Sequence, residues 1–242
     1  MGTSADRASG SGGAWTPLKH AASAYAKAAA CGSGGTRGTA ERVLGRHVEV
    51  LGGPAGAAAG ARAGRTGMAG LGGVLSGIGN AGLVAALVAN GLGNLVGKDR
   101  FDVLEGLITL VAGDASDLES QAARDAVCDV LDDLFADADT WEELEATAVS
   151  TEALQEMLTT FLSHYVYNRL PVLAEKLARF MDPAAARDAD RQVVEMIRAL
   201  VTLRMPDDPI RFDWQGPAGQ RFADDAVREV YGIIAELGKD TT

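Results

Sequence analysis

The chain begins MGTSADRASGSGGAW, and its second residue is the one best suited to chemistry. A residue as small as Gly2 after Met1 is typical of proteins that lose the initiator methionine, which would leave a bare glycine amine. The pKa of an α-amino group is about 7.7 to 8.0, against about 10.4 for lysine, so about a tenth of it is the unprotonated nucleophile at neutral pH. The sequence therefore offers the Gly2 amine as a nucleophile. An ordinary loose terminus is the simpler alternative.

The other ionisable residues do not form a catalytic constellation. His20, His47 and His164 are scattered singly, and no nucleophile motif accompanies them. Carboxylates three and four positions apart share one helix face and could in principle hold a cation, although such a run is usually the solvated side of a helix. The carboxylates concerned are Asp125, Asp129, Asp132 and Asp133. We expect a protein that is not an enzyme and has no metal site or cofactor.

A polar and aromatic cluster lies in the segment HYVYNRL, directly before Pro171, where we expect the helix to kink. Tyrosine and arginine are favoured at protein interfaces, so the cluster is a candidate partner contact. Packing and hydrogen bonding inside a helical bundle is the alternative. The candidate residues are Tyr165, Tyr167, Asn168 and Arg169.

The composition predicts that the candidate residues lie on helices. Aromatic residues make up 5% of the chain, alanine and leucine are abundant, and β-branched residues form no long alternating runs, so the composition favours helices over sheets. We predict an all-α, multi-helix bundle with a disordered Gly/Ser-rich tail over residues 1–13. Ser116, with Glu119 three residues later, predicts a capping box at the start of one helix.

Charge and glycine divide the chain near Lys98. Residues 1–97 hold 8 Lys/Arg and 3 Asp/Glu, whereas residues 98–242 hold 14 and 30. We therefore expect a weakly basic, Gly/Ala-rich helical region over 14–97 and an acidic helical domain over 98–242. The acidic part would repel a nucleic-acid backbone, and the basic part lacks clustered arginines and lysines interleaved with aromatic residues. Direct nucleic-acid binding is not expected.

The segment 66–97 has 32 consecutive residues without a charge, ten of which are glycine. Its length and neutrality meet a criterion for a membrane span, and small residues four apart allow close helix packing in a bilayer. Gly-Gly and Gly-Asn pairs instead favour two shorter helices packed against the acidic part. We expect the packed helices and keep membrane insertion as the alternative. Two cysteines and a start unlike a secretion signal favour the cytoplasm.

Several blocks together resemble the QatB family, the second component of QatABCD anti-phage defence systems. They are the MGTS start, the Gly/Ser-rich lead, RVLGRHVEVLGGPAGAAAGARAG, ARDAVCDVLDDLF and FLSHYVYNRL. The resemblance implies a non-catalytic subunit that works with a QatA-like ATPase, a QueC-like enzyme (QatC) and a TatD-like nuclease (QatD). QueC enzymes use ATP to activate the carboxylate of a 7-deazaguanine and pass it to an amine. The matching acceptor here is Gly2.

Three functional hypotheses follow. In the first, the chain is a defence-complex subunit whose Gly2 amine accepts a deazaguanine-type group. A lead of about 13 Gly/Ser-rich residues has a root-mean-square reach on the order of 20 Å, which would allow the terminus to enter a partner's active site. In the second, a membrane-active effector inserts residues 66–97. In the third, the chain is a plain helical scaffold with an inert tail.

Overall fold

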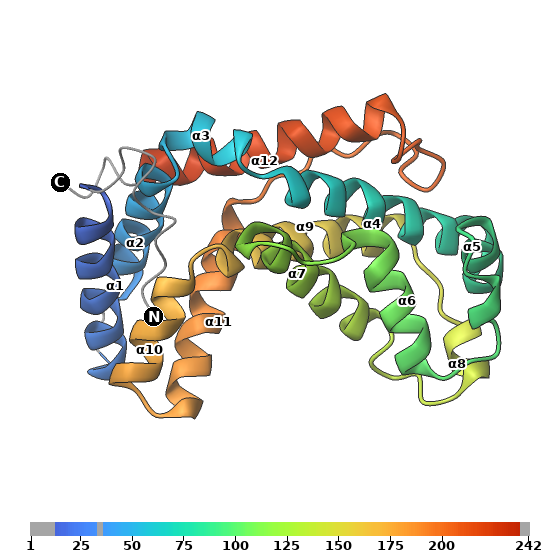
Figure 1. Cartoon of the computed structure of the whole chain (residues 1–242), viewed down its shortest axis with the longest axis horizontal. Coiled ribbons are helices and arrows are strands. Elements are labelled where there is room, and N and C mark those ends of the chain that lie inside the picture. Colours follow the sequence, from blue (N-terminus) through green and yellow to red (C-terminus); the bar gives the residue numbers. More distant parts are fainter. Residues whose placement is uncertain (1–12, 33–35, 238–242) are drawn as a thin grey trace. The chain divides into compact units, whose positions relative to one another are not determined.

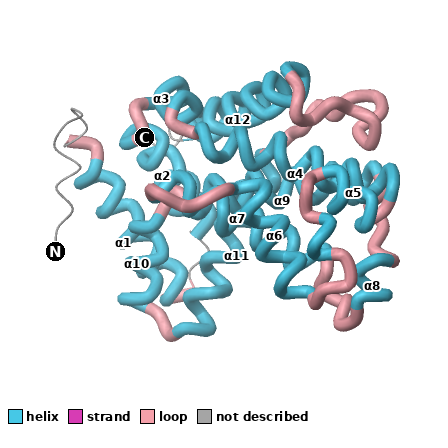
Figure 2. The backbone as a smooth tube through the Cα atoms, turned by 45° about the vertical axis from the view of Figure 1, so that its right-hand side comes forward, coloured by secondary structure: helices cyan, strands magenta, loops and turns pink. Residues whose placement is uncertain are grey.

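The structure is a computed structural model that describes residues 13–32 and 36–237, and all its regular elements are helices (Figures 1 and 2). In chain order they are α1 (Trp15–Ala30), α2 (Thr36–Val50), α3 (Gly53–Ala59), α4 (Arg62–Ala81), α5 (Leu83–Ala89), the 3-10 helix η2 (Gly93–Leu95), α6 (Arg100–Ala112), α7 (Leu118–Leu134), α8 (Trp141–Glu145), α9 (Thr151–Asn168), α10 (Pro171–Phe180), α11 (Pro183–Leu200) and α12 (Pro217–Leu237). No strand forms within the described ranges, which confirms the all-α prediction. The tail predicted for 1–13 lies outside them except for Gly13.

Capping side chains fix where several helices begin. The Asp99 carboxylate accepts a hydrogen bond from the backbone N–H of Asp102 at the start of α6, and Ser150 Oγ accepts one from Ala153 at the start of α9. The kink expected at Pro171 is instead a complete break: α9 ends at Asn168 and α10 begins at Pro171. Proline disfavours helical geometry in the residue before it, and Leu170 accordingly has φ −113° and ψ 55°.

The chain divides into two compact units made of separate sequence segments. Unit 1 contains the described residues up to 60, residues 170–200 and those from 228 onward, and unit 2 contains residues 61–169 and 201–227. The change of composition near Lys98 therefore falls inside unit 2. Helix α12 contributes to both units, with the division at residues 227 and 228.

Unit 1 is assembled around α1. This helix contacts α2, α10 and α11, and Figure 1 shows these helices side by side. Its own buried side chains, including Leu18, Ala22 and Tyr25, fill the space between them. The Tyr25 hydroxyl donates a hydrogen bond to the backbone oxygen of Ala189 on α11 at 2.9 Å. Burial raises the pKa of Tyr25 to about 12, with a smaller contribution from the nearby Asp190 carboxylate.

Unit 2 is assembled around α4, the glycine-rich helix. This helix contacts α5, α6, α7 and α9. A Cβ atom at Gly67 would lie 2.9 Å from the Phe161 ring, and a Cβ atom at Gly72 would lie 2.5 Å from the Trp214 ring. The neighbouring aromatic rings therefore occupy the space that a side chain at either position would need. Close packing inside this unit is the structural reason for these two glycines.

The uncharged segment 66–97 is divided among α4, α5 and η2, with non-helical residues between them. Helix α4 ends where Gly82 adopts φ 82° and ψ 165°, a conformation that favours glycine. The prediction of shorter packed helices is thus confirmed. None of the described helices combines the length and the apolarity needed to cross a bilayer.

Candidate functional site

Tyr165, the central residue of the predicted aromatic cluster, is fully buried in unit 2. Its hydroxyl donates a hydrogen bond to Oε1 of Glu119 on α7 at 2.5 Å. The same carboxylate accepts hydrogen bonds from the backbone N–H groups of Ala63 and Gly64 at 3.0 and 3.1 Å. Helix α4 begins after Ala61, whose methyl side chain cannot cap it, so a carboxylate from another helix satisfies its first N–H groups.

The capping box predicted from Ser116 and Glu119 is therefore wrong. The cap residue of α7 is Asp117, which accepts a hydrogen bond from the Ser120 N–H at 2.8 Å while Ser120 Oγ accepts from the Asp117 N–H at 3.0 Å. The Ser120 N–H and the Ser120 hydroxyl both donate hydrogen bonds to the Asp117 carboxylate and lower its pKa. Because the cap of α7 lies one residue later than expected, Glu119 takes no part in it and caps α4 instead.

Gly64 makes room for this arrangement. An ideal Cβ atom at Gly64 would overlap the Tyr165 ring. One turn later on α4 and one turn earlier on α9, Phe161 lies against Gly67 and stacks with Tyr165 at a centroid separation of 6.1 Å. The tyrosine thus joins α4, α7 and α9 inside unit 2. Its aromatic body packs and its hydroxyl completes the cap.

The other three cluster residues are half-buried at the end of α9. Asn168 Nδ2 donates a hydrogen bond to the Ala122 oxygen at 3.4 Å, and the Arg169 guanidinium lies 5.6 Å from the centre of the Tyr165 ring. Tyr167 is equally half-buried. The structure therefore brings Tyr165 and Arg169 together and leaves Tyr165 no exposed surface. A partner contact at Tyr167, Asn168 and Arg169 stays a prediction.

The acidic residues of α7 pair with neighbouring groups. Asp129 Oδ2 lies 2.6 Å from His164 Nδ1, and Asp125 accepts a hydrogen bond from Gln121. Asp132 Oδ1 lies 3.2 Å from an Arg100 nitrogen. Within the described residues no group of three or more histidine, cysteine, aspartate or glutamate side chains is arranged to hold a metal ion.

The thiol of Cys128 lies on the same helix and points to the Asp132 carboxylate, with Sγ 3.6 Å from Oδ2. Burial raises the pKa of this thiol, and the Asp132 charge raises it further. A raised pKa keeps the thiol protonated near neutral pH and disfavours nucleophilic chemistry at this position.

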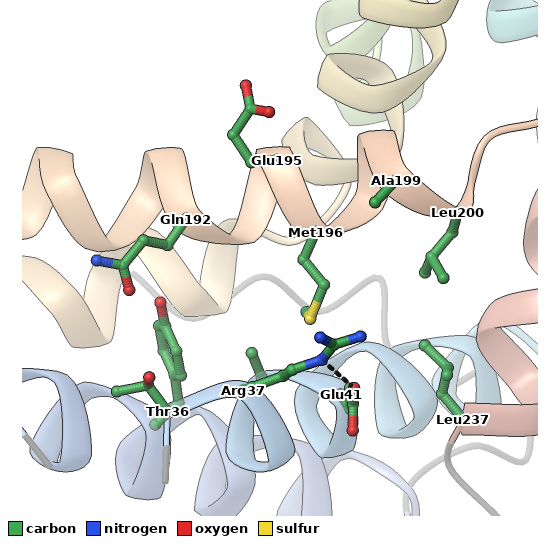
Figure 3. Close-up of a pocket in the computed structure, with 11 residues that line it drawn as sticks. Thr36, Arg37, Glu41, Gln192, Glu195, Met196, Ala199, Leu200 and Leu237 are labelled. Atoms are coloured by element: carbon green, nitrogen blue, oxygen red, sulfur yellow. Dashed lines mark hydrogen bonds and ion pairs between the residues drawn. The ribbon is translucent and has the colours of Figure 1, made fainter. Parts of the chain in front are cut away.

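Unit 1 carries a groove of about 410 Å³ between α2 and α11 (Figure 3). The Met196 side chain points from α11 toward α2, and Leu200 and Leu237 line one end. Arg37 Nε and Glu41 Oε1 form an ion pair at 3.1 Å on the α2 side, as the dashed line marks. Sequence reasoning did not find this groove, because its lining comes from positions more than 150 residues apart.

Gly2, the predicted modification site, lies outside the described residues. Sequence reasoning also missed Glu119 as the half-buried partner of the buried Tyr165. The available signal was a carboxylate that follows a better capping residue, Asp117, by two positions.

Comparison with known proteins gives one match, to a protein family. The family model described as QatB, Qat anti-phage system associated protein QatB, matches residues 52–234. No curated protein and no solved structure matches the chain. The matched region includes the glycine-rich α4, the Glu119 cap and Tyr165. Since the match covers well over half of the sequence, the chain belongs to the QatB family of the Qat anti-phage system.

Proposed function

We propose that this chain is a non-catalytic subunit of an anti-phage defence complex and that its Gly2 amine accepts a 7-deazaguanine-type group. The observation that carries the proposal is membership of the QatB family. The partners we propose are a QueC-like enzyme, a QatA-like ATPase and a QatD-like nuclease of the TatD type. The QueC-like enzyme would deliver the group, because enzymes of that class activate a 7-deazaguanine carboxylate.

The proposed step forms an amide bond. ATP activates the carboxylate of the deazaguanine acid by converting one carboxylate oxygen into part of a leaving group. The unprotonated Gly2 nitrogen attacks the carboxyl carbon, the activated oxygen departs with its phosphate, and the nitrogen releases a proton. The product is the N-terminal glycine amide, heavier than the free terminus by the acid minus one water.

The chemistry of the amines favours Gly2 over lysine. At neutral pH about a tenth of an α-amine is unprotonated, against less than about a thousandth of a lysine amine. Lys176 Nζ also lies 3.0 Å from Glu175 Oε1, and Lys27 Nζ lies 5.6 Å from the centre of the Phe180 ring, so an attack by either would disturb an existing contact. Lys98 is exposed and serves as the comparison amine.

The decisive experiment is intact mass spectrometry of the full chain after co-expression with its QueC-like partner. We expect loss of Met1 and a gain of the acid minus water, which fragmentation places on Gly2. Lys98→Arg should leave the gain unchanged. Gly2→Glu should retain Met1 and prevent the gain, because a large second residue blocks methionine removal.

An unchanged N-terminus beside a partner shown to consume ATP with the deazaguanine acid would overturn the proposal. Gly2→Ala refines the test, since it keeps both methionine removal and a primary amine while adding one methyl group. We expect slower modification of this variant. Deleting residues 2–13 separates the scaffold hypothesis: unchanged phage protection after the deletion would favour an inert tail.

A further inference from the structure

A second cavity, which we call the unit 2 pocket, lies wholly within unit 2 between α4, the ends of α5 and α6, and the first turns of α12. Its volume is about 690 Å³, within the range of small-molecule sites. Ala69 and Val111 are buried at its floor, and Leu110 forms an apolar wall. Gly70 exposes backbone there without a side chain. This part of the lining is therefore apolar.

The rim of the unit 2 pocket carries a carboxylate next to a guanidinium. Arg65 of α4 and Asp224 of α12 approach to 3.6 Å, with side chains 25% and 37% exposed. A carboxylate beside a guanidinium combines hydrogen-bond acceptors with hydrogen-bond donors in one part of the lining. Partial burial strengthens hydrogen bonds made there relative to fully exposed ones.

Further polar groups surround this pair. Thr66 and Arg62 lie on the α4 side, and the amides of Gln215 and Gln220 lie on the side of α12. A Cβ atom at Gly73 would come within 3.0 Å of Gln215 Nε2, so the glycine allows that amide to lie close to α4. Amides both donate and accept, which suits a ligand whose edges carry both kinds of group.

We propose that the unit 2 pocket binds a guanine-type heterocycle. The edge of such a ring presents an amino N–H, a ring N–H and a carbonyl oxygen in a row, which is the complement of the Asp224 oxygens and an Arg65 N–H. An adenine-type edge offers one amino group beside a ring nitrogen and would satisfy only two of these groups. The apolar floor takes the ring face, and the choice of a 7-deazaguanine as its source rests on the proposed function.

The test is calorimetric titration of the full chain, made without the QueC-like partner, with 7-carboxy-7-deazaguanine. We expect saturable binding at one site per chain. The corresponding 7-deazaadenine acid should bind at least tenfold more weakly, because a lost charge-assisted hydrogen bond costs at least about that factor. Guanosine monophosphate serves as a third probe. Equal binding supports the ring class, and tighter binding of the nucleotide identifies guanine nucleotides, rather than the deazaguanine, as the ligand of the pocket.

Asp224→Asn should weaken binding of the deazaguanine acid tenfold or more, since one acceptor becomes a donor. The matched control is Asp225→Asn, which changes the next residue on α12, an exposed carboxylate that does not line the pocket. If Asp224→Asn lowers the melting temperature, Gln220→Leu at an exposed rim position replaces it, with a smaller expected loss. Equal binding of both ring types, equal effects of the two aspartate changes, or no saturation at millimolar ligand would overturn the proposal.

The experiments distinguish failure of the pocket proposal from failure of the proposed modification of Gly2. Asp224→Asn should still gain the Gly2 modification, because the chemistry resides in the partner enzyme. If Gly2 is modified but the heterocycle does not bind, only the proposal of a guanine-binding pocket is overturned. If the chain binds guanine-type rings selectively but its terminus stays unmodified, the proposed function is overturned and the proposal of a guanine-binding pocket is retained.

Discussion

Helices α1 and α4 are both rich in small residues, yet they stabilise their units in different ways. In unit 1, α1 fills its surroundings with its own side chains, such as Leu18 and Tyr25. In unit 2, α4 leaves space, and Phe161, Tyr165 and Trp214 from other segments fill it. Alanine lowers the cost of forming a helix, whereas glycine raises it by about 1 kcal/mol per residue. The glycines of α4 that face these rings, Gly64, Gly67 and Gly72, are therefore explained by packing and not by helix propensity.

Among substitutions that test this difference between α1 and α4, we expect Gly72→Ala to have the largest effect on stability. The new Cβ would lie 2.5 Å from the Trp214 ring, and a fully buried tryptophan inside a packed core has no room to move away. We expect a loss of about 3 kcal/mol in the free energy of unfolding, at the upper end for overpacking. Urea denaturation measures it.

Gly38→Ala is the matched control on α2 of unit 1. Nothing lies within 4 Å of a Cβ atom at that position, so the same change should stabilise the chain by about 0.5 to 1 kcal/mol. Equal destabilisation by both alanines would contradict the packing explanation of the α4 glycines.

Removing the Glu119 carboxylate, which caps α4 and accepts a hydrogen bond from the Tyr165 hydroxyl, should have the next largest effect. Glu119→Ala leaves the N–H groups of Ala63 and Gly64 and the Tyr165 hydroxyl without their carboxylate acceptor. We expect a loss of about 2 to 3 kcal/mol, because buried and half-buried donors that lose their acceptor retain their desolvation cost. Tyr165→Phe removes only one of these hydrogen bonds and should cost about 1 kcal/mol. A larger loss for Tyr165→Phe than for Glu119→Ala would reverse the order that the geometry predicts.

In unit 1 the corresponding buried tyrosine is Tyr25, and pH can probe it. Its pKa is about 12 in the folded chain and about 10 when unfolded, so folding favours the protonated form. The associated stability is fully present below pH 10 and is lost as the pH rises from 10 to 12. Two units of pKa correspond to about 2 to 3 kcal/mol. Tyr25→Phe should flatten this part of the stability profile, and an unchanged slope would count against a buried, protonated Tyr25.

The smallest effect is expected at the rim of the unit 1 groove. Arg37 pairs with Glu41 one turn away, but the arginine side chain is 83% exposed. Exposed pairs contribute little because water and salt screen them, so Arg37→Gln should change stability by no more than about 0.5 kcal/mol. A change above 1 kcal/mol in the free energy of unfolding, measured by thermal or chemical denaturation, would show that the pair contributes more than an exposed ion pair should.

The sequence alone determined the class of fold and much of the local structure. Alanine-rich and leucine-rich runs, with prolines and glycines between them, were enough to predict helices and to divide the segment 66–97 into shorter ones. Helix starts depend on nearby residues, so caps such as Ser150 are readable in the sequence. The Glu119 cap was misassigned because Ser116 and Asp117 are both good capping residues, and local pattern does not decide between them.

Only the tertiary structure decided which distant residues meet. Nothing near Gly64 in the sequence indicates that Tyr165 lies against it, since the two are about 100 positions apart. The pairing of Arg65 with Asp224 is more remote still, and it defines the rim of the unit 2 pocket. Local propensities act over a few residues, whereas packing and ion pairs join any segments that the fold brings together. The terminal amine of Gly2 is the reverse case, because its reactivity follows from its chemistry and not from its neighbours.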